Sequence, residues 1–409
     1  MVVVSHPVGN ANVRAVLDAF QRAGCLHEFY TTVAADSERG GSYLPKRLAA
    51  QMRRRTFPVP ATKIRQRPWL ELMRLSIGRH GFGTANEWVT RVCKDLDRHV
   101  AGSLRVEESG KVDVAYAYED CASQTFAVAK QRGWKCVYDL PIAYWGLSQR
   151  LMREELQRWP DWAPTMQGVH DSGEKLERKD AELRLSDVVV CCSRFVLDSL
   201  PEWARQGKRC VVAEFGSDQD AAGGERAENE NEDENERRPL RVLFAGSMTQ
   251  RKGLADLFEA AKLLGRDKVE LVVLGQPVAP LSFYQQQCPQ FRHEPTRSRQ
   301  GVLELMRNCD VFVLPSLVEG RALVQQEALS CGLPLIITPN TGGEDLIDEG
   351  ETGFVVPIRA PEKIAERLEW FCRHRHELKG MREAARRKAA LYTWQEYGRK
   401  VLEATMGTD

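Results

Sequence analysis

Short apolar runs alternate with amphipathic stretches along most of this chain, as they do in parallel α/β proteins. In the first half, runs of β-favouring residues end at polar or glycine-bearing turns and are followed by apolar residues at helical spacing. The strands predicted there are 2–5, 26–32, 112–118, 135–138, 188–192 and 211–214. This alternation predicts a Rossmann-like domain with a parallel sheet.

The second half repeats the pattern after an abrupt change of composition. Residues 219–238 hold no apolar residue larger than alanine before the strands resume, which is typical of a solvated linker. Strands are predicted at 241–245, 269–274, 311–314, 335–338 and 354–356, and helices at 254–261, 300–308, 361–376, 381–391 and 392–406. We therefore predict a first domain over 1–218, an acidic linker over 219–238, and a second domain over 239–391. The final helix, within 392–409, is free to pack back on the first domain.

Composition changes this picture little. Of the 409 residues, 43% are hydrophobic and 28% are charged, and the net charge of +1 gives no reason to expect a nucleic-acid partner. The 11 cysteines show no C-x-x-C pair, which favours reduced thiols in a cytoplasmic protein. No apolar run approaches the roughly 18 residues of a membrane span, and the start MVVVSHPVGN does not have the pattern of a signal peptide.

The stretch 310–343 carries the densest motif. It is predicted to form a strand, a loop, a helix and a second strand, with Glu319 in the loop and Glu327 in the helix. In a doubly wound sheet, this loop and the start of this helix face the ligand crevice. Two carboxylates there can accept strong hydrogen bonds from a polyhydroxylated ligand. The alternative is that both are solvated charges on a helix face.

The motif resembles that of a large family. The arrangement P-S-x-x-E-G-x6-E-A-x3-G-x-P is similar to the E-x7-E motif of the retaining GT-B glycosyltransferases of group 1, such as glycogen synthases and bacterial mannosyltransferases. The resemblance implies α/β GT-B architecture, with two Rossmann-like domains facing each other across a cleft. It also implies sugar transfer from a nucleoside diphosphate to an acceptor hydroxyl, with the anomeric configuration retained and without a metal or cofactor. It is clearest over 240–357.

A second motif is suited to bind the phosphates of such a donor. Residues 246–253 form a glycine-bearing loop that leads into a helix, where free N–H groups favour anions. By resemblance, Lys252 occupies the place of the diphosphate-binding lysine in G-R-x-x-x-x-K-G. The family's arginine is replaced by Ser247 after Gly246, and Arg251 is expected to compensate. Basic residues are disfavoured at a helix start, so a bound anion explains them better than exposure does.

The resemblance also implies the remaining donor contacts. Glu327 would hold the ribose hydroxyls, and Glu319 the hydroxyls of the transferred sugar. The backbone beside the sugar and the distal phosphate would come from Gly320, Arg321, Ala322 and Leu323, and the base would lie against 291–293, which includes His293. Many relatives have Phe-Gly where this chain has Arg321-Ala322. Two alternatives stay open for the Arg321 side chain, which either contacts a charged or unusual sugar or points to solvent.

The first domain offers candidates at the predicted strand ends. Gly9 would let the backbone approach the diphosphate closely. Several relatives carry a cleft histidine after the strand that here ends before Asp139, but this chain has no histidine in that loop. Asp139 is therefore a candidate for supporting the sugar cation. Ser193 is expected to cap a helix. We see no D-x-D at a strand end and no His/Asp cluster that would suit a catalytic metal.

The acceptor is not identified by the sequence. Residues 42–105 hold fourteen Lys and Arg against four Asp and Glu, a local net charge of +10, with apolar residues interleaved. Either this is a basic amphipathic surface for an anionic membrane or an anionic acceptor, or the charges are solvated helix faces over a buried core. Two other functions also stay open: a GT-B sugar-nucleotide epimerase or phosphorylase, and a non-catalytic nucleotide-sugar-binding protein.

Overall fold

The first domain is built on one parallel sheet. The computed structural model describes residues 1–35, 55–77, 85–107, 110–166, 171–217 and 238–407, so the predicted linker lies almost entirely outside the described residues. In this sheet the strands run in the order β3-β2-β1-β4-β5-β6-β7, and every pairing is parallel. The strands are β1 (Val2–Ser5), β2 (Leu26–Thr31), β3 (Ile64–Gln66), β4 (Val114–Tyr118), β5 (Lys135–Leu140), β6 (Val188–Cys191) and β7 (Arg209–Val212).

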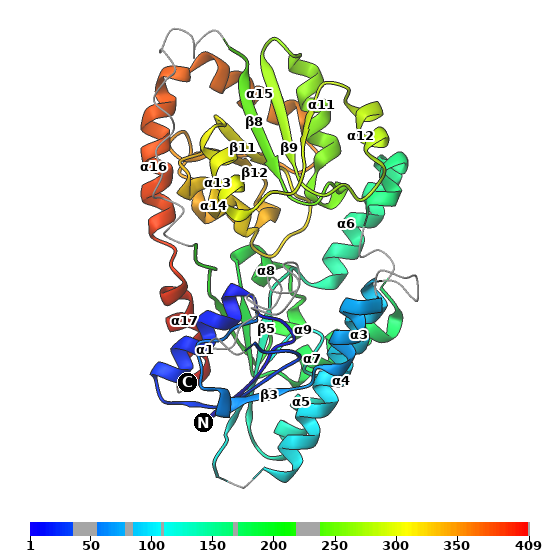
Figure 1. Cartoon of the computed structure of the whole chain (residues 1–409), viewed down its shortest axis with the longest axis vertical. Coiled ribbons are helices and arrows are strands. Elements are labelled where there is room, and N and C mark those ends of the chain that lie inside the picture. Colours follow the sequence, from blue (N-terminus) through cyan, green and yellow to red (C-terminus); the bar gives the residue numbers. More distant parts are fainter. Residues whose placement is uncertain (36–54, 78–84, 108–109, 167–170, 218–237, 408–409) are drawn as a thin grey trace.

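The second domain repeats this plan. Its strands run in the order β10-β9-β8-β11-β12-β13, again with parallel pairings. They are β8 (Leu240–Ala245), β9 (Val269–Leu274), β10 (Arg292–Glu294), β11 (Val311–Leu314), β12 (Leu335–Ile337) and β13 (Gly353–Val355). The predicted α/β class with two Rossmann-like domains is confirmed, and Figure 1 shows the second domain above the first.

The helices follow the apolar spacing of the sequence. In α1 (Ala11–Arg22), the residues Val13, Val16, Leu17 and Phe20 are buried, and in β1 all four residues are buried, as expected for a central strand. The other first-domain helices are α3 (Trp69–Ile77), α4 (Ala85–Val106), α5 (Ser123–Gln131), α7 (Gly173–Leu185), α8 (Arg194–Ser199) and α9 (Glu202–Arg205). The second domain has α11 (Leu254–Leu264), α12 (Leu281–Gln287), α13 (Arg299–Arg307), α14 (Leu323–Ser330), α15 (Pro361–Arg373) and α16 (Leu378–Ala390).

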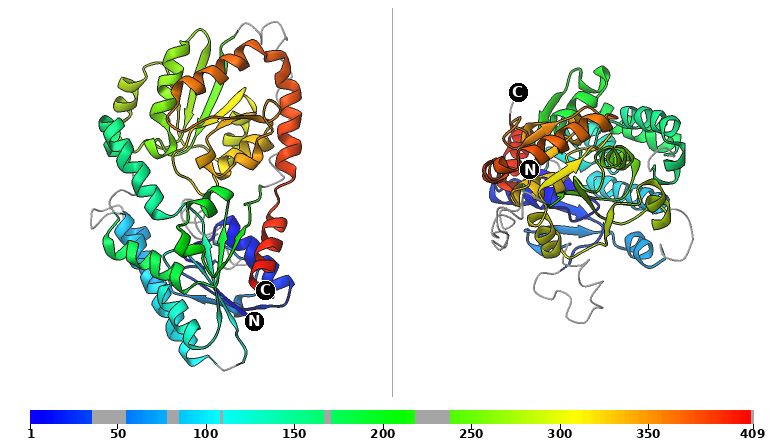
Figure 2. Two further views of the ribbon diagram at one scale, coloured as in Figure 1. Left: turned by 180° about the vertical axis from the view of Figure 1, so that it is seen from behind. Right: turned by 90° about the horizontal axis from the view of Figure 1, so that it is seen from above.

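Two segments cross between the domains. Helix α17 (Trp394–Met406) follows α16 downward and packs on α1, where Gly398 is so close to the carbonyl of Ala15 that an added Cβ would lie 2.8 Å from its oxygen (Figures 1 and 2). In the other direction, α6 (Trp145–Arg158) and the short helix η2 (Pro160–Thr165) leave the first domain and reach α12. Trp162 of η2 is buried in the core of the second domain, in edge contact with Phe258, Phe283 and Tyr284.

Three details of the predicted elements were wrong. The prediction contained neither β3 nor β10, which are short edge strands with mostly polar side chains, and it placed a loop where α12 forms. Strand β5 continues to Leu140, two residues beyond the predicted end. Asp139 therefore lies inside a strand, not in the loop after it. In the described part of the chain, no helix is both long enough and apolar enough to span a bilayer.

Candidate functional site

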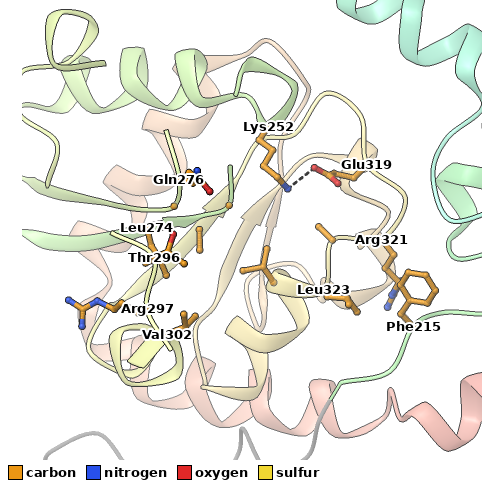
Figure 3. Close-up of a pocket in the computed structure, with 15 residues that line it drawn as sticks. Phe215, Lys252, Leu274, Gln276, Thr296, Arg297, Val302, Glu319, Arg321 and Leu323 are labelled. Carbon is orange, nitrogen blue, oxygen red and sulfur yellow. Dashed lines mark hydrogen bonds and ion pairs between the residues drawn. The ribbon is translucent and has the colours of Figure 1, made fainter. Parts of the chain in front are cut away.

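A cavity of about 540 Å³ opens at the carboxyl ends of β8 and β9 in the second domain (Figure 3). It lies where a doubly wound sheet is expected to bind its ligand. The wall is largely apolar, with charged groups at opposite ends, as is usual for small-molecule sites. It is lined by Phe215, Ala245, Gly246, Lys252, Leu274, Gly275, Gln276, Thr296, Arg297, Val302, Glu319, Arg321, Ala322, Leu323 and Val324.

Lys252 and Glu319 line one end of this cavity, and Arg251, which does not line it, pairs with the same carboxylate. The Nζ of Lys252 lies 2.7 Å from Oε1 of Glu319, and Nη1 of Arg251 lies 2.9 Å from the same oxygen. Burial would raise the pKa of Glu319, but Arg251 and Lys252 outweigh it and hold the pKa below its usual value. The carboxylate is therefore ionised at neutral pH. Two cations against one carboxylate leave the cluster at net +1, so it can receive an anion.

Glycines bring the backbone close to Lys252. Gly246 follows β8 with φ of 151°, and an added Cβ would lie 2.9 Å from Cδ of Lys252. At the end of the neighbouring strand β9, a Cβ on Gly275 would lie 1.8 Å from the carbonyl oxygen of Gly246. Side chains at either position would displace Lys252 or push the strand ends apart. Gly246 therefore has a geometric role beside the predicted phosphate site.

Gln250, two residues before Lys252, ties the loop to α6. Its Nε2 donates to Oε2 of Glu155 on α6 at 2.8 Å and to Asp256 at 3.0 Å. Its backbone N–H donates to Oγ1 of Thr165 at 3.1 Å. The crossing segment from the first domain thus holds the cationic loop in place. Sequence reasoning missed this, because nothing in the local pattern shows that 145–165 packs on the second domain.

The two domains touch at Gly320, beside Glu319. A Cβ on Gly320 would lie 1.7 Å from the carbonyl oxygen of Pro141, and Oγ of Ser193 donates to the carbonyl of Gly320 at 2.6 Å. The same hydroxyl accepts from the N–H of Val196 at 3.2 Å, so the predicted helix cap at Ser193 is confirmed. Ser193 therefore fixes the first domain against the loop that carries Glu319.

The Arg321 side chain does not point to solvent, and its contact with the sugar stays a prediction, since Arg321 lines the cavity. The guanidinium is fully buried and bonds Asp345 with two nitrogens, at 2.7 and 3.0 Å, and the carbonyl of Gly342 at 2.9 Å. It also stands over the ring of Tyr392, 4.9 Å from the centroid. Arg321 thus holds the turn at Gly342 from inside the domain. Among the backbone amides predicted to lie beside the sugar, the N–H of Ala322 already donates to the carbonyl oxygen of Thr341 at 3.2 Å.

Several other predicted site residues do not line the cavity. Glu327 lies half-buried on α14 and does not line the cavity, and Gly9 and Ser247 do not line it either. His293 lies on β10, and its Nε2 pairs with the carbonyl of Gly275 at 3.0 Å. The far end of the cavity is lined instead by Gln276, Thr296, Arg297 and Val302. Gln276 follows β9 after Gly275, so its position near a strand end was a signal that sequence reasoning overlooked.

Asp139 is buried between β4 and β6 and does not line this cavity. Its Oδ2 has no hydrogen-bond partner, and burial raises its pKa to about 7. His6 is likewise buried against the ring of Tyr118, with its pKa lowered to about 3 by burial. Burial thus disfavours the charged form of both groups.

Residues 225–388 match the family model described as "Glycosyl transferases group 1". The match spans most of the second domain. The chain is 27% identical over 169 residues to a putative colanic acid biosynthesis glycosyltransferase, WcaL, of Salmonella typhimurium, which is 37% of this chain and 41% of that protein. It is 28% identical over 174 residues to the D-inositol 3-phosphate glycosyltransferase of Paenarthrobacter aurescens, covering 40% and 43%. The matches thus span about two fifths of the length of these curated relatives.

Solved structures share the fold over nearly the whole chain. Sucrose-phosphate synthase from Thermosynechococcus elongatus aligns with a TM-score of 0.63 at 14% identity, over 98% of this chain and 96% of that one. Anabaena Alr3699/HepE in complex with UDP aligns with a TM-score of 0.64 at 15% identity, over 98% of each chain. The predicted GT-B architecture is confirmed.

Among the described residues, the His, Cys, Asp and Glu side chains close enough to share an ion are His27, Glu28 and Glu107, in the first domain. They do not line the cavity at Lys252, and Glu28 already accepts from Tyr30 and Arg65. The cavity's own charged groups suit a phosphate and a polyol.

Proposed function

We propose that this chain transfers a glycosyl unit from a nucleoside-diphosphate sugar to an acceptor hydroxyl, with the anomeric configuration retained. The observation that carries the proposal is the convergence of Lys252 and Arg251 on Glu319 at the end of an elongated, largely apolar cavity. The cations suit a diphosphate, the carboxylate suits sugar hydroxyls, and the apolar wall between Leu274 and Val324 suits a ribose and base. The family match of the second domain and the UDP named for the Anabaena structure support this class of donor.

The cation cluster would stabilise the leaving group. As the bond between the sugar and the phosphate breaks, negative charge grows on the phosphate oxygens, and positive charge grows on the sugar. Lys252 and Arg251 are already held at the cavity by Glu319, so they need little reorganisation to meet that charge. The start of α14, whose first residues line the cavity, adds backbone N–H groups and the positive end of its dipole.

Glu319 would change partners when the donor binds. In the free protein it neutralises the two cations, and a bound diphosphate takes over that role. The carboxylate then accepts hydrogen bonds from the hydroxyls of the transferred sugar. In this proposal the acceptor oxygen forms its bond to the anomeric carbon on the face that the phosphate leaves. The acceptor proton passes to the leaving phosphate, so the chain need supply neither a nucleophile nor a metal.

A peripheral membrane contact is a second proposal, carried by α3. Trp69, Leu72 and Met73 lie on one face of this helix and are 68%, 40% and 44% exposed. Much of the basic charge in the described part of 42–105 is paired, since Arg55 and Arg74 bond Glu71, and Arg67 bonds Asp95. The exposed apolar face of α3, within a segment that carries a net charge of +10 over 42–105, suits an anionic bilayer surface.

A donor panel tests the proposed function. The protein is incubated with the nucleoside-diphosphate forms of glucose, galactose, mannose and N-acetylglucosamine, each with and without an acceptor mixture, and with and without EDTA. A glycosyltransferase releases the nucleoside diphosphate from one donor, faster with acceptor present, and is unaffected by EDTA. Conversion to a different nucleotide sugar would indicate an epimerase, and dependence on inorganic phosphate a phosphorylase. Binding without turnover would indicate a non-catalytic protein.

A further inference from the structure

A second cavity of about 330 Å³ lies between the domains, on the other side of the Arg251–Glu319 ion pair from the donor cavity. Its walls come from α6, α7 and the ends of β4 and β5, with Arg251 as the contribution of the second domain. Lys252 and Glu319 line the first cavity, whereas Arg251 lines this one. Because Arg251 and Glu319 are 2.9 Å apart, the two cavities meet at this pair. A molecule in the second cavity is therefore next to the proposed sugar.

Apart from Arg251, whose charge the donor diphosphate would share under the proposed function, the cations that line the second cavity are already paired with carboxylates. Lys179 is buried and lies 2.6 Å from Glu119 and 3.6 Å from Asp120. Burial alone would lower the pKa of Lys179, but these carboxylates raise it above its usual value. Lys175 lies 3.0 Å from Asp171 and 4.0 Å from Asp120. A phosphate would have to break these buried pairs, at a cost that a neutral ligand avoids.

The remaining wall combines polar and apolar surface. Gln149 is buried, and its Oε1 accepts from Arg153 at 3.0 Å, which directs the amide but leaves Nε2 as a donor. Ser148 adds a hydroxyl that can donate or accept. Ile142 and Ala143 are apolar, and the Trp145 ring is fixed by its Nε1–H bond to Asp180 at 2.7 Å. Alternating polar groups and an aromatic face match a sugar ring, which has hydroxyls at its rim and C–H groups on its faces.

From this geometry we infer that the acceptor is a neutral, polyhydroxylated molecule, a sugar or glycoside without a phosphate, bound between Gln149, Trp145 and the Glu119–Lys179 pair. The inference rests on the proposed function and adds the class of its second substrate. A hydroxyl both donates and accepts, so it can bridge Glu119 and Lys179 without separating them. The volume suits about one or two sugar rings.

The test compares neutral acceptors with their phosphorylated counterparts. With the donor identified by the panel, initial rates are measured for glucose, mannose, galactose and their methyl glycosides, for maltose, and for glucose 6-phosphate and mannose 6-phosphate. Donor hydrolysis in water is measured in parallel, because it reports the donor site without an acceptor. We expect kcat/KM for at least one neutral sugar to exceed that of its phosphate by tenfold or more.

Gln149→Leu removes the amide donor, and Gln157→Leu is the matched control, because Gln157 lies on the same helix and is exposed. We expect Gln149→Leu to lower kcat/KM for the acceptor about tenfold, through KM, as the loss of one hydrogen bond predicts. Donor hydrolysis and Tm should match those of Gln157→Leu. The inference is overturned if the phosphorylated sugar is preferred, if no neutral sugar alters donor consumption, or if the two variants behave alike. Absence of donor consumption in every arm, water included, would instead refute the proposed function.

Discussion

Replacing Lys252 by methionine removes the cation nearest to Glu319 while keeping most of the side-chain volume. In the donor complex, we expect the ammonium to bond the diphosphate, and a hydrogen bond to a charged group contributes about 1.5–3 kcal/mol. The variant should therefore lose roughly tenfold to a hundredfold in kcat/KM, and more in kcat if the bond strengthens as the phosphate leaves. Initial rates of nucleoside-diphosphate release measure this loss.

The same structure limits the effect on stability. Glu319 keeps Arg251 at 2.9 Å, so Lys252→Met does not leave a buried carboxylate without a partner. We expect the free energy of unfolding to fall by only about 1 kcal/mol, measured by urea denaturation. Lys262→Met is the matched control, because Lys262 lies on α11 with its side chain 40% exposed and its ammonium paired with Glu259 at the surface. Turnover of Lys252→Met at the parental rate would refute the placement of the diphosphate.

Three further predictions test other parts of the molecule. Asp139→Asn should keep turnover but abolish one pH dependence of the free energy of unfolding. The native pKa of Asp139, near 7, lies above the unfolded value of 3.8, so the parent loses stability as pH rises from about 4 to 7. Urea titrations of the variant over this pH range should lack the fall. Trp162→Ala should lose about 3–5 kcal/mol in thermal unfolding, because the ring is enclosed by the second core, whereas Trp69→Ala should lose little. Co-sedimentation should show binding to anionic but not neutral vesicles, weakened by salt and by Trp69→Ala; equal recovery in the supernatant at low salt would refute membrane contact.

The sequence predicted the central strands well because they are buried on both faces. Apolar runs such as 2–5 and 311–314 leave little freedom of interpretation, and the observed ends agree within about two residues. The edge strands β3 and β10 were missed because a strand with one neighbour need not be apolar, and Ile64 is the single apolar residue in the two together. Local pattern carries little information about such strands.

The candidate site was likewise only partly predictable from the sequence. Lys252 and Glu319 could be brought together only through the resemblance, since 67 positions separate them, and the structure places them 2.7 Å apart. The environment of Arg321 could not be predicted, because its partner Asp345 follows 24 residues later on another turn. The docking of Trp162 into the other domain is equally a tertiary effect. Contacts between distant segments therefore decide which charged residues are available to a ligand.

The most direct test of the donor site is a crystal structure with the nucleoside diphosphate that the donor panel identifies. The account predicts that the diphosphate lies within hydrogen-bonding distance of Lys252 and the start of α14, with the ribose and base along the wall between Leu274 and Val324. Glu319 should turn from the two cations toward the space where the sugar binds. A nucleotide bound elsewhere, with Lys252 and Arg251 still paired to Glu319, would contradict the central claim.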